Sequence, residues 1–302
     1  MIPWFPQFKQ LGLTDKENIE WITKQYPPYS DYNFVSLWSW DVKEAAQVAK
    51  IHDNLVIRFH DYISGEVFYS FLGTHKAHEV VTMLLDQSRA DQISSKLKLI
   101  PECVIPSLGS SPSFAIEEDR DNFDYILSVP ELMTLSGNKY GPKRNFLNRF
   151  KKLHGDKAKI VPLTLTDPSV QREIETLFYR WEEVRGKARE ETDNELKTIA
   201  KFFRGADQFT LSAIGLVVNG KLSGFSIDEV VHDGYGIIHF EKADTAYVGI
   251  FEYLKQQTAI HLGKTGCKYI NYEQDLGLEG LRKAKLSYRP VGYLKKYTIS
   301  AN

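Results

Sequence analysis

The feature that most constrains the fold is a succession of strand and helix patterns in the second half of the chain. Two strand-like segments within 212–231 flank Asn219-Gly220, the strongest short signal for a two-residue hairpin. Beyond the hairpin, periodicity predicts a strand, a helix and another strand over 235–240, 249–263 and 267–272. An antiparallel meander that continues into a strand-helix-strand crossover predicts a layered α+β domain.

Two amphipathic helices are predicted before this hairpin. Asp167-Pro168 supplies an N-cap and a first-turn proline. Apolar residues then follow at helical spacing: Val170, Ile174, Leu177, Phe178, Trp181 and Val184. A second helix is predicted over 193–203. A short basic helix near 279–286 and a closing strand near 292–299 complete this half.

The first half contains a weaker version of the same order. Segments 54–59 and 66–71 are rich in β-branched and aromatic residues and predict paired strands around Ser64-Gly65. A helix and two short strands are predicted over 76–90, 113–116 and 125–128. The two halves share no repeat at the level of residues, so topology alone suggests a duplication.

A chain of 302 residues usually divides into two domains rather than building one core. We predict an N-terminal domain over 1–130, a bridging basic helical segment over 131–157 and a C-terminal domain over 158–302. The order of elements is the layout of the Gcn5-related N-acetyltransferase fold. We therefore expect an α+β protein with two tandem domains of this kind, with mixed, largely antiparallel central sheets.

Composition excludes several classes of protein. Hydrophobic residues make up 42% of the chain and charged residues 25%, which excludes a disordered protein. No apolar run is long enough to span a membrane, and no secretory signal is visible at the N-terminus. Two cysteines are too few for a disulfide framework or a thiolate zinc site, and we expect no metal. These observations predict a cytoplasmic protein.

The net charge of -1 conceals an uneven distribution. Residues 1–128 contain 11 Lys+Arg and 18 Asp+Glu, whereas residues 129–302 contain 27 and 21. Two stretches of the basic half, 139–152 and 282–296, hold six cations each and no acid. Such runs form either a solvated helix face or a surface for an anionic partner.

Three motifs carry a resemblance to a known family. His239–Asp244, Asn271–Pro290 and the basic motif Lys143–Phe150 resemble the phosphatidylglycerol lysyltransferase C-terminal-like family, a domain of unknown function. That family is related to peptidoglycan-bridge peptidyltransferases and lipid aminoacyltransferases. The resemblance implies tandem acetyltransferase-like domains and transfer of an aminoacyl group from charged tRNA to a lipid head group or a peptide amine. The lipid-modifying relatives carry a membrane domain that we do not see in this sequence.

The donor has two candidates, and no cofactor is firmly implied. In the acetyltransferase fold, acyl-CoA places its phosphates at the N-terminus of the crossover helix. Only Gly249 resembles the glycine-rich loop that grips the pyrophosphate. We therefore favour aminoacyl-tRNA over acyl-CoA as the donor substrate.

Carboxylates at the ends of the central strands are the candidate catalytic groups: Glu241, Glu273 and Asp275. Alternation along the strand places Glu241 and His239 on one face and Lys242 on the other. A carboxylate here serves as a general base or binds the α-amino group of an aminoacyl donor. The alternative is a structural network in which Arg282 or Arg289 neutralises these acids.

Mostly cationic residues are the candidate contacts to substrate: Lys143, Arg144, Arg149, Lys242, Tyr272, Arg282, Lys283, Lys285 and Arg289. Their cations would bind tRNA phosphates in a salt-dependent way. The alternative is that Arg144 and Arg289 pair internally with buried carboxylates. The leading hypothesis is thus an acyl- or aminoacyltransferase. Its competitor is a noncatalytic module that uses a basic groove to bind RNA or another anionic ligand.

Overall fold

The computed structural model describes residues 1–61, 64–109, 113–185 and 189–302, without the side chains of 183–192. The predicted apolar position Val184 therefore lies outside the described side chains. The chain divides into two compact units. Unit 1 comprises Met1–Asp124, Gln274–Arg282 and Tyr293–Asn302, and unit 2 comprises Tyr125–Glu273 and Lys283–Gly292.

Unit 1 is a layered α+β structure. Its strands are β1 (Lys9–Gln10), β2 (Gln47–Ile51), β3 (Asn54–His60), β4 (Val67–Leu72), β5 (Lys96–Pro101), β6 (Phe114–Glu118) and β14 (Lys296–Ala301). Its α-helices are α1 (Lys16–Thr23), α2 (Phe34–Trp40) and α3 (Ala77–Ala90). Its 3-10 helices are Leu13–Asp15, Ser30–Tyr32, Glu102–Leu108 and Arg120–Asn122.

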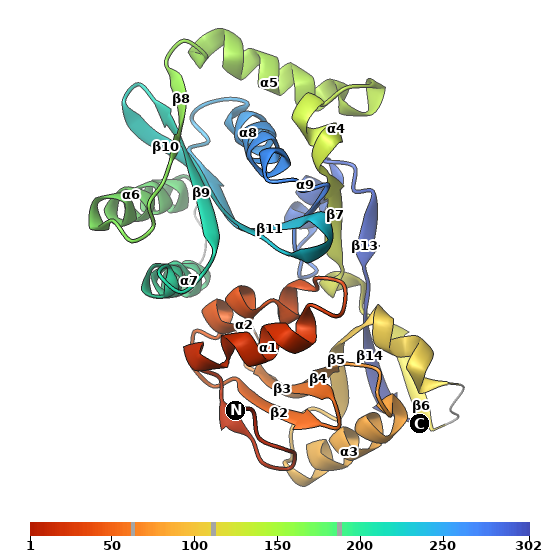
Figure 1. Cartoon of the computed structure of the whole chain (residues 1–302). Helices are drawn as coiled ribbons and strands as arrows, with labels where there is room; N and C mark the ends of the chain where they lie inside the picture. Colours follow the sequence, from red (N-terminus) through yellow and green to blue (C-terminus); the bar gives the residue numbers. More distant parts are fainter. Residues whose placement is uncertain (62–63, 110–112, 186–188) are drawn as a thin grey trace. The chain divides into compact units, whose positions relative to one another are not determined.

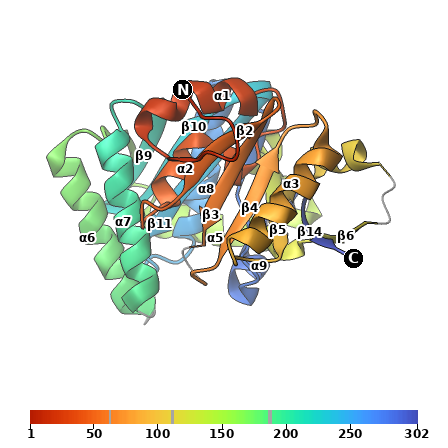
Figure 2. The ribbon, with the colours of Figure 1, turned by 90° about the horizontal axis from the view of Figure 1, so that it is seen from below.

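The strands of unit 1 form two sheets, ordered β1-β2-β3-β4 and β5-β14-β6. Helix α3 packs on one face of the first sheet, and α1 and α2 lie on the opposite face (Figures 1 and 2). The helical spacing of Val80, Val81 and Leu84 places all three in one core with Val56 and Phe71 of the sheet. The predicted helix over 76–90 is thus confirmed.

Unit 2 is also an α+β structure. Its strands are β7 (Asp124–Ser128), β8 (Ala158–Pro162), β9 (Leu211–Val218), β10 (Lys221–Val230), β11 (Tyr235–Ala243) and β12 (Tyr269–Asn271), with β13 (Gly292–Leu294) at its boundary. Its α-helices are α4 (Val129–Thr134), α5 (Gly141–His154), α6 (Pro168–Arg185), α7 (Arg189–Gly205) and α8 (Ile250–Lys264). Helix α9 (Glu279–Leu286) continues from unit 1 into unit 2. The 3-10 helices are Asn138–Tyr140 and His232–Gly234.

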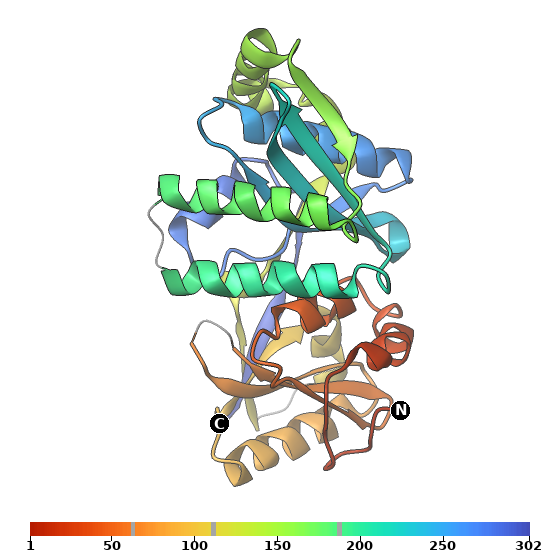
Figure 3. The ribbon, with the colours of Figure 1, turned by 90° about the vertical axis from the view of Figure 1, so that its left-hand side faces the viewer.

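The sheet that contains these strands has the order β13-β7-β12-β11-β10-β9-β8. The predicted hairpin is confirmed: Asn219 and Gly220 both have positive φ, 53° and 76°, as the favoured hairpin turn requires. Helices α6 and α7 run side by side against one face of the β9-β10-β11 meander (Figure 3). Helix α8 packs on the other face, and α4 and α5 pack against α8.

The two units repeat one order of elements in the part of the chain that is described. Each contains a strand and two helices, β1-α1-α2 in unit 1 and β8-α6-α7 in unit 2, followed by three antiparallel strands and a helix that crosses to a further strand. Unit 2 has β7, α4 and α5 before this series. In unit 1 the crossover is β4-α3-β5, and in unit 2 it is β11-α8-β12. This correspondence supports the duplication suggested by the order of sequence patterns.

The end of the chain differs from its prediction. We expected one closing strand near 292–299 in the second half, but the structure has β13 and β14, and β14 pairs with β5 and β6 of unit 1. Conversely, β7 pairs with β12 in unit 2. A strand pattern in the sequence indicates which residues are buried but not which sheet the strand pairs with. The sequence therefore did not predict that β14 belongs to unit 1. The division into continuous domains over 1–130 and 158–302, with a bridge over 131–157, stays a prediction. The compact units of the structure are discontinuous in sequence.

A buried ionic cluster fixes the last strand within unit 1. The ammonium of Lys296, which is fully buried, lies 2.8 Å from Asp124 Oδ1 and also pairs with Asp31. The backbone N–H and hydroxyl of Ser30 donate to Asp124, at 2.8 and 2.6 Å. Gln274 donates to Asp31 at 2.7 Å. The cluster thus joins four segments of the chain, around residues 30, 124, 274 and 296.

We predict that Lys296→Met destabilises the protein by about 3–5 kcal/mol, because it leaves two carboxylates buried without a counter-ion. Urea denaturation measures the change in the free energy of unfolding. Lys295→Met is the matched control, because that neighbouring lysine pairs with Glu118 in solvent and should alter stability little. Equal effects of the two substitutions would contradict the role given to Lys296.

Candidate active site

The candidate site lies where two central strands of unit 2 separate. Strand β12 pairs in parallel with β11 only from Tyr235 to Ile237. Strand β11 then continues to Ala243, paired with β10 alone among the described strands. Glu241, the first catalytic candidate, lies in this second half of β11. The separation of strands expected from the acetyltransferase layout is therefore present at the predicted position.

Glu241 is paired with a lysine that was not among the predicted site residues. Glu241 Oε2 lies 2.6 Å from the ammonium of Lys255 on α8, and the two side chains are 5% and 1% exposed. The same ammonium lies 3.6 Å from the ring centroid of Tyr272. Burial lowers the pKa of Lys255, while Glu241 and Asp228 oppose this shift. We expected Arg282 or Arg289 to neutralise Glu241, but its ion-pair partner is Lys255.

Asp228 on β10 is a second buried carboxylate near this pair. Its Oδ1 accepts a hydrogen bond of 2.6 Å from the Ser226 hydroxyl, and its Oδ2 has no hydrogen-bond partner among the described residues. Burial raises the pKa of Asp228 to about 7, and the charge of Glu241 adds to the increase. A carboxyl group with a pKa near neutrality and an unsatisfied oxygen is typical of functional sites.

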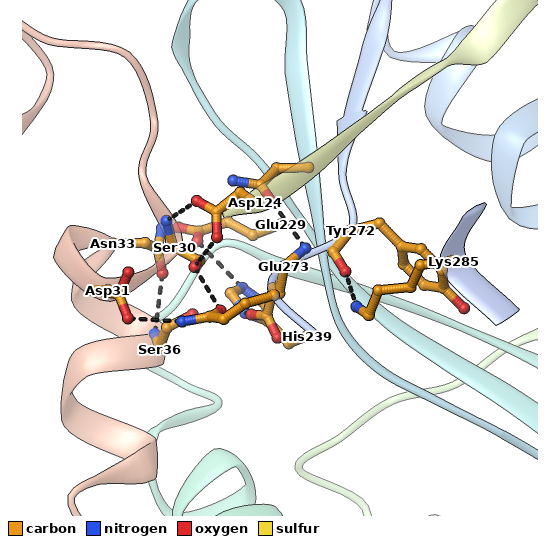
Figure 4. Close-up of polar contacts among 12 residues, drawn as sticks. Ser30, Asp31, Asn33, Ser36, Asp124, Glu229, His239, Tyr272, Glu273 and Lys285 are labelled. Carbon is orange, nitrogen blue, oxygen red and sulfur yellow. Dashed lines mark hydrogen bonds and ion pairs between the residues drawn. The ribbon is translucent and has the colours of Figure 1, made fainter. Parts of the chain in front are cut away.

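His239 links the strands at the point of separation. Its ring is buried, with Nε2 3.3 Å from Glu229 on β10 and Nδ1 3.6 Å from Glu273 just after β12 (Figure 4). Ile237 is the last β11 residue paired with β12, opposite Asn271, so His239 and Glu273 each lie two residues further along. The ion pair thus continues the contact between strands after their backbone pairing ends. Glu273 is therefore engaged by His239.

The predicted alternation along β11 is wrong at His239. Its ring centroid lies 5.3 Å from that of Phe202 on α7, whereas Glu241 contacts α8. The pairing of β10 with β11 shifts between Ile227 and Asp228, and this bulge leaves His239 without an opposite residue. A bulge redirects side chains and interrupts a strict two-residue period.

We predict that the stability of the protein declines as pH rises through about 9. Burial lowers the pKa of His239, but Glu229 and Glu273 outweigh this effect and raise it from 6.5 to about 9. Because the folded-state pKa is the higher one, the contribution is complete below about 6.5 and is lost through about 9. Urea denaturation across this range should show the decline in the wild type. His239→Gln should remove it; an unchanged pH profile in that variant would refute the assignment.

Asp275, the third catalytic candidate, belongs to unit 1. Its buried carboxylate accepts hydrogen bonds of 2.8 and 2.9 Å from Arg282 and lies 3.4 Å from Arg120. Arg282 also pairs with Asp121. Two guanidinium groups thus occupy the oxygens of Asp275. This arrangement fits the predicted alternative of a structural network involving Arg282.

Most cations of the predicted substrate surface have contacts inside the protein. Lys143 pairs with Glu252 at 3.0 Å, and Lys242 pairs with Glu195. Arg144 donates to the carbonyls of Leu135 and Gly137 rather than to a buried carboxylate. Lys285 donates to the carbonyl of Tyr272, as Figure 4 shows. Arg149, Lys283 and Arg289 are exposed.

The start of α8 is covered by another helix. Gly249 precedes it with φ of 85°, and a Cβ atom there would lie 2.1 Å from the carbonyl oxygen of Phe146 on α5. A glycine is required by both the backbone conformation and this close approach. Because a carbonyl oxygen repels phosphate, the contact argues against a coenzyme A pyrophosphate at this helix start.

The described residues contain no group of three or more potential metal ligands. Among the helices described, none is long and apolar enough to cross a membrane.

We predict that the buried pair of Glu241 and Lys255 behaves as one unit in stability measurements. Lys255→Met should cost about 3–5 kcal/mol because it leaves Glu241 buried and uncompensated. Adding Glu241→Gln should recover much of that loss, giving a large coupling in a double-mutant cycle measured by urea denaturation. Additive effects would indicate that the two side chains do not interact.

Comparison with known proteins identifies the family. Residues 23–300 match the family described as phosphatidylglycerol lysyltransferase, C-terminal, and the chain belongs to this family. A conserved protein of unknown function from Bacteroides thetaiotaomicron is 30% identical, with 100% of both chains covered and a TM-score of 0.86.

Two further solved structures share the fold at 14% identity. They are the C-terminal domain of a putative lysylphosphatidylglycerol synthetase from Agrobacterium fabrum (TM-score 0.66; 96% of this chain and 92% of that one) and L-PGS from Bacillus licheniformis (0.61; 95% and 91%). These likenesses confirm the predicted α+β fold of tandem acetyltransferase-like domains. An uncharacterized protein of Mycoplasmoides gallisepticum is 24% identical over 61% of this chain, and the match spans 57% of that relative.

Proposed function

We propose that the protein is an aminoacyltransferase that moves an aminoacyl group from charged tRNA to an amine or hydroxyl of a lipid head group or peptide. The observation that carries the proposal is the group of buried charges in unit 2, where Glu241 and Lys255 pair beside Asp228. Membership of the family supports the reaction class. The names of the family and of its structural neighbours make lysine and phosphatidylglycerol the first substrates to test.

The proposed reaction is direct transfer. The acceptor oxygen or nitrogen attacks the ester carbonyl, the new ester or amide bond forms, and the bond to the tRNA ribose breaks. The proton lost by the acceptor passes to a base, and the ribose oxygen takes up a proton as it leaves. Because the ester is already activated, orientation of the reactants supplies much of the acceleration.

Two carboxylates receive separate roles in this proposal. Glu241 accepts the acceptor's proton, and the ammonium of Lys255 lies 2.6 Å from its Oε2. Asp228 binds the α-ammonium of the aminoacyl group through Oδ2, since an ammonium donor satisfies an oxygen that otherwise has no hydrogen-bond partner among the described residues. His239 and Glu273 hold the diverging strands in place beside them.

The donor would reach the site through contacts between its phosphates and exposed cations. Lys283 and Arg289 are exposed in the second basic run, and we assign the contacts to tRNA phosphates to them. Acyl-CoA is disfavoured as donor because the Phe146 carbonyl approaches the start of α8.

Steady-state kinetics with charged tRNA separate the two proposed roles. Glu241→Gln should lower kcat about 10²- to 10⁴-fold with little change in KM, as expected for loss of a general base. Asp228→Asn should raise KM about tenfold or more, because it weakens a charge-assisted hydrogen bond. Asp156→Asn, which alters an exposed acid of the same unit, should change neither constant.

Glu241→Gln removes the counter-ion of Lys255, so a lower kcat in this variant could also come from partial unfolding. The double variant Glu241→Gln/Lys255→Met removes both charges and should fold yet remain inactive. A kcat within threefold of wild type in either Glu241 variant would eliminate Glu241 as the base.

A further inference from the structure

Helix α5 has one face in the core and one face in solvent. Leu147 and Phe150 are 3% and 0% exposed and pack in the two apolar clusters of unit 2. On the outer side, Phe146 and Leu153 are 48% and 50% exposed. These two residues are seven apart, so they lie one above the other on the same helix face. Figure 1 shows α5 at the periphery of unit 2, with α8 on its inner side.

The same outer face is strongly basic. Arg149 lies three residues after Phe146 and four before Leu153, which places its exposed guanidinium between them. Lys152 is also exposed, and α5 contains no acidic residue. Lys151 instead donates to Gln256 on α8 and is not part of this face. Lys157 and Lys159 extend the exposed positive charge into β8, with Asp156 as the exposed acid between them and the helix.

Single exposed apolar side chains are common on protein surfaces and need no explanation. Here two large apolar side chains share a helix face with cations, which is the pattern of helices that lie in a membrane interface. RNA phosphates would explain the cations but not Leu153, which has no ring on which a base could stack. An anionic bilayer accounts for both, because its head groups attract the cations and its acyl boundary accepts Phe146 and Leu153.

We propose that the outer face of α5, defined by Phe146, Arg149, Lys152 and Leu153, binds the surface of an anionic phospholipid membrane. The inference goes beyond the proposed reaction and does not depend on it, because binding to a bilayer requires neither donor nor catalysis. It also assigns Arg149 to the lipid surface, whereas the sequence pattern predicts contact with tRNA for this residue.

Co-sedimentation of the full chain with vesicles tests this surface without any tRNA present. The protein should bind vesicles of phosphatidylglycerol and phosphatidylcholine, and binding to pure phosphatidylcholine should be at least about tenfold weaker. Phe146→Ser/Leu153→Ser should weaken binding to the anionic vesicles about tenfold or more, because burial of both side chains is lost. Arg149→Ala/Lys152→Ala should weaken it and reduce its dependence on salt.

Tyr179→Ser is the matched control, since Tyr179 is 52% exposed on α6 of the same unit. It should leave vesicle binding within about twofold of wild type, and the thermal unfolding of all variants should match wild type because the altered side chains are exposed. Absence of binding to anionic vesicles would overturn the proposal. An unaltered affinity of Phe146→Ser/Leu153→Ser for anionic vesicles would also overturn it. That result would mean that the face binds through charge alone.

Discussion

The burial of Lys255 is the constraint on which the architecture of unit 2 depends. An ammonium that is 1% exposed must have a counter-charge nearby, and Glu241 supplies it from the half of β11 that β12 does not cover. Apolar residues can often replace such a pair without loss of stability. The pair lies beside Asp228, whose Oδ2 has no hydrogen-bond partner among the described residues, and the proposed function gives these buried charges a role beyond folding.

Unit 1 uses a similar arrangement of charges for a different purpose. Lys296 also stands between two carboxylates, but its partners are further satisfied by Ser30 and Gln274, so the cluster is closely bonded. It fixes the final strand, which lies between β5 and β6 in the second sheet of unit 1. Each cluster includes a carboxylate oxygen with no hydrogen-bond partner among the described residues, Asp31 Oδ2 in unit 1 and Asp228 Oδ2 in unit 2. The former oxygen forms an ion pair with Lys296, whereas the latter is the one to which we assign a ligand.

Sequence patterns predicted the order of elements well, because helices such as α3 and hairpins such as β9-β10 are determined by local periodicity and turn residues. They placed Glu241 correctly at the separating strands for the same reason. They missed the roles of Lys255, Asp228 and Lys296, because other charged residues in α8 and β10 hide which side chains are buried. Which charges pair, and which sheet the last strand joins, depend on contacts distant in sequence that no local pattern encodes.

The most direct test of the account is a transfer assay with the full chain. Aminoacyl-tRNAs carrying a radiolabelled amino acid would be incubated with the protein and either phosphatidylglycerol vesicles or a peptide amine. The account predicts that label moves covalently to an acceptor in the wild type and that Glu241→Gln/Lys255→Met abolishes this transfer. Equal binding of charged and uncharged tRNA, with no label transferred to either acceptor, would contradict it and indicate a noncatalytic binding module.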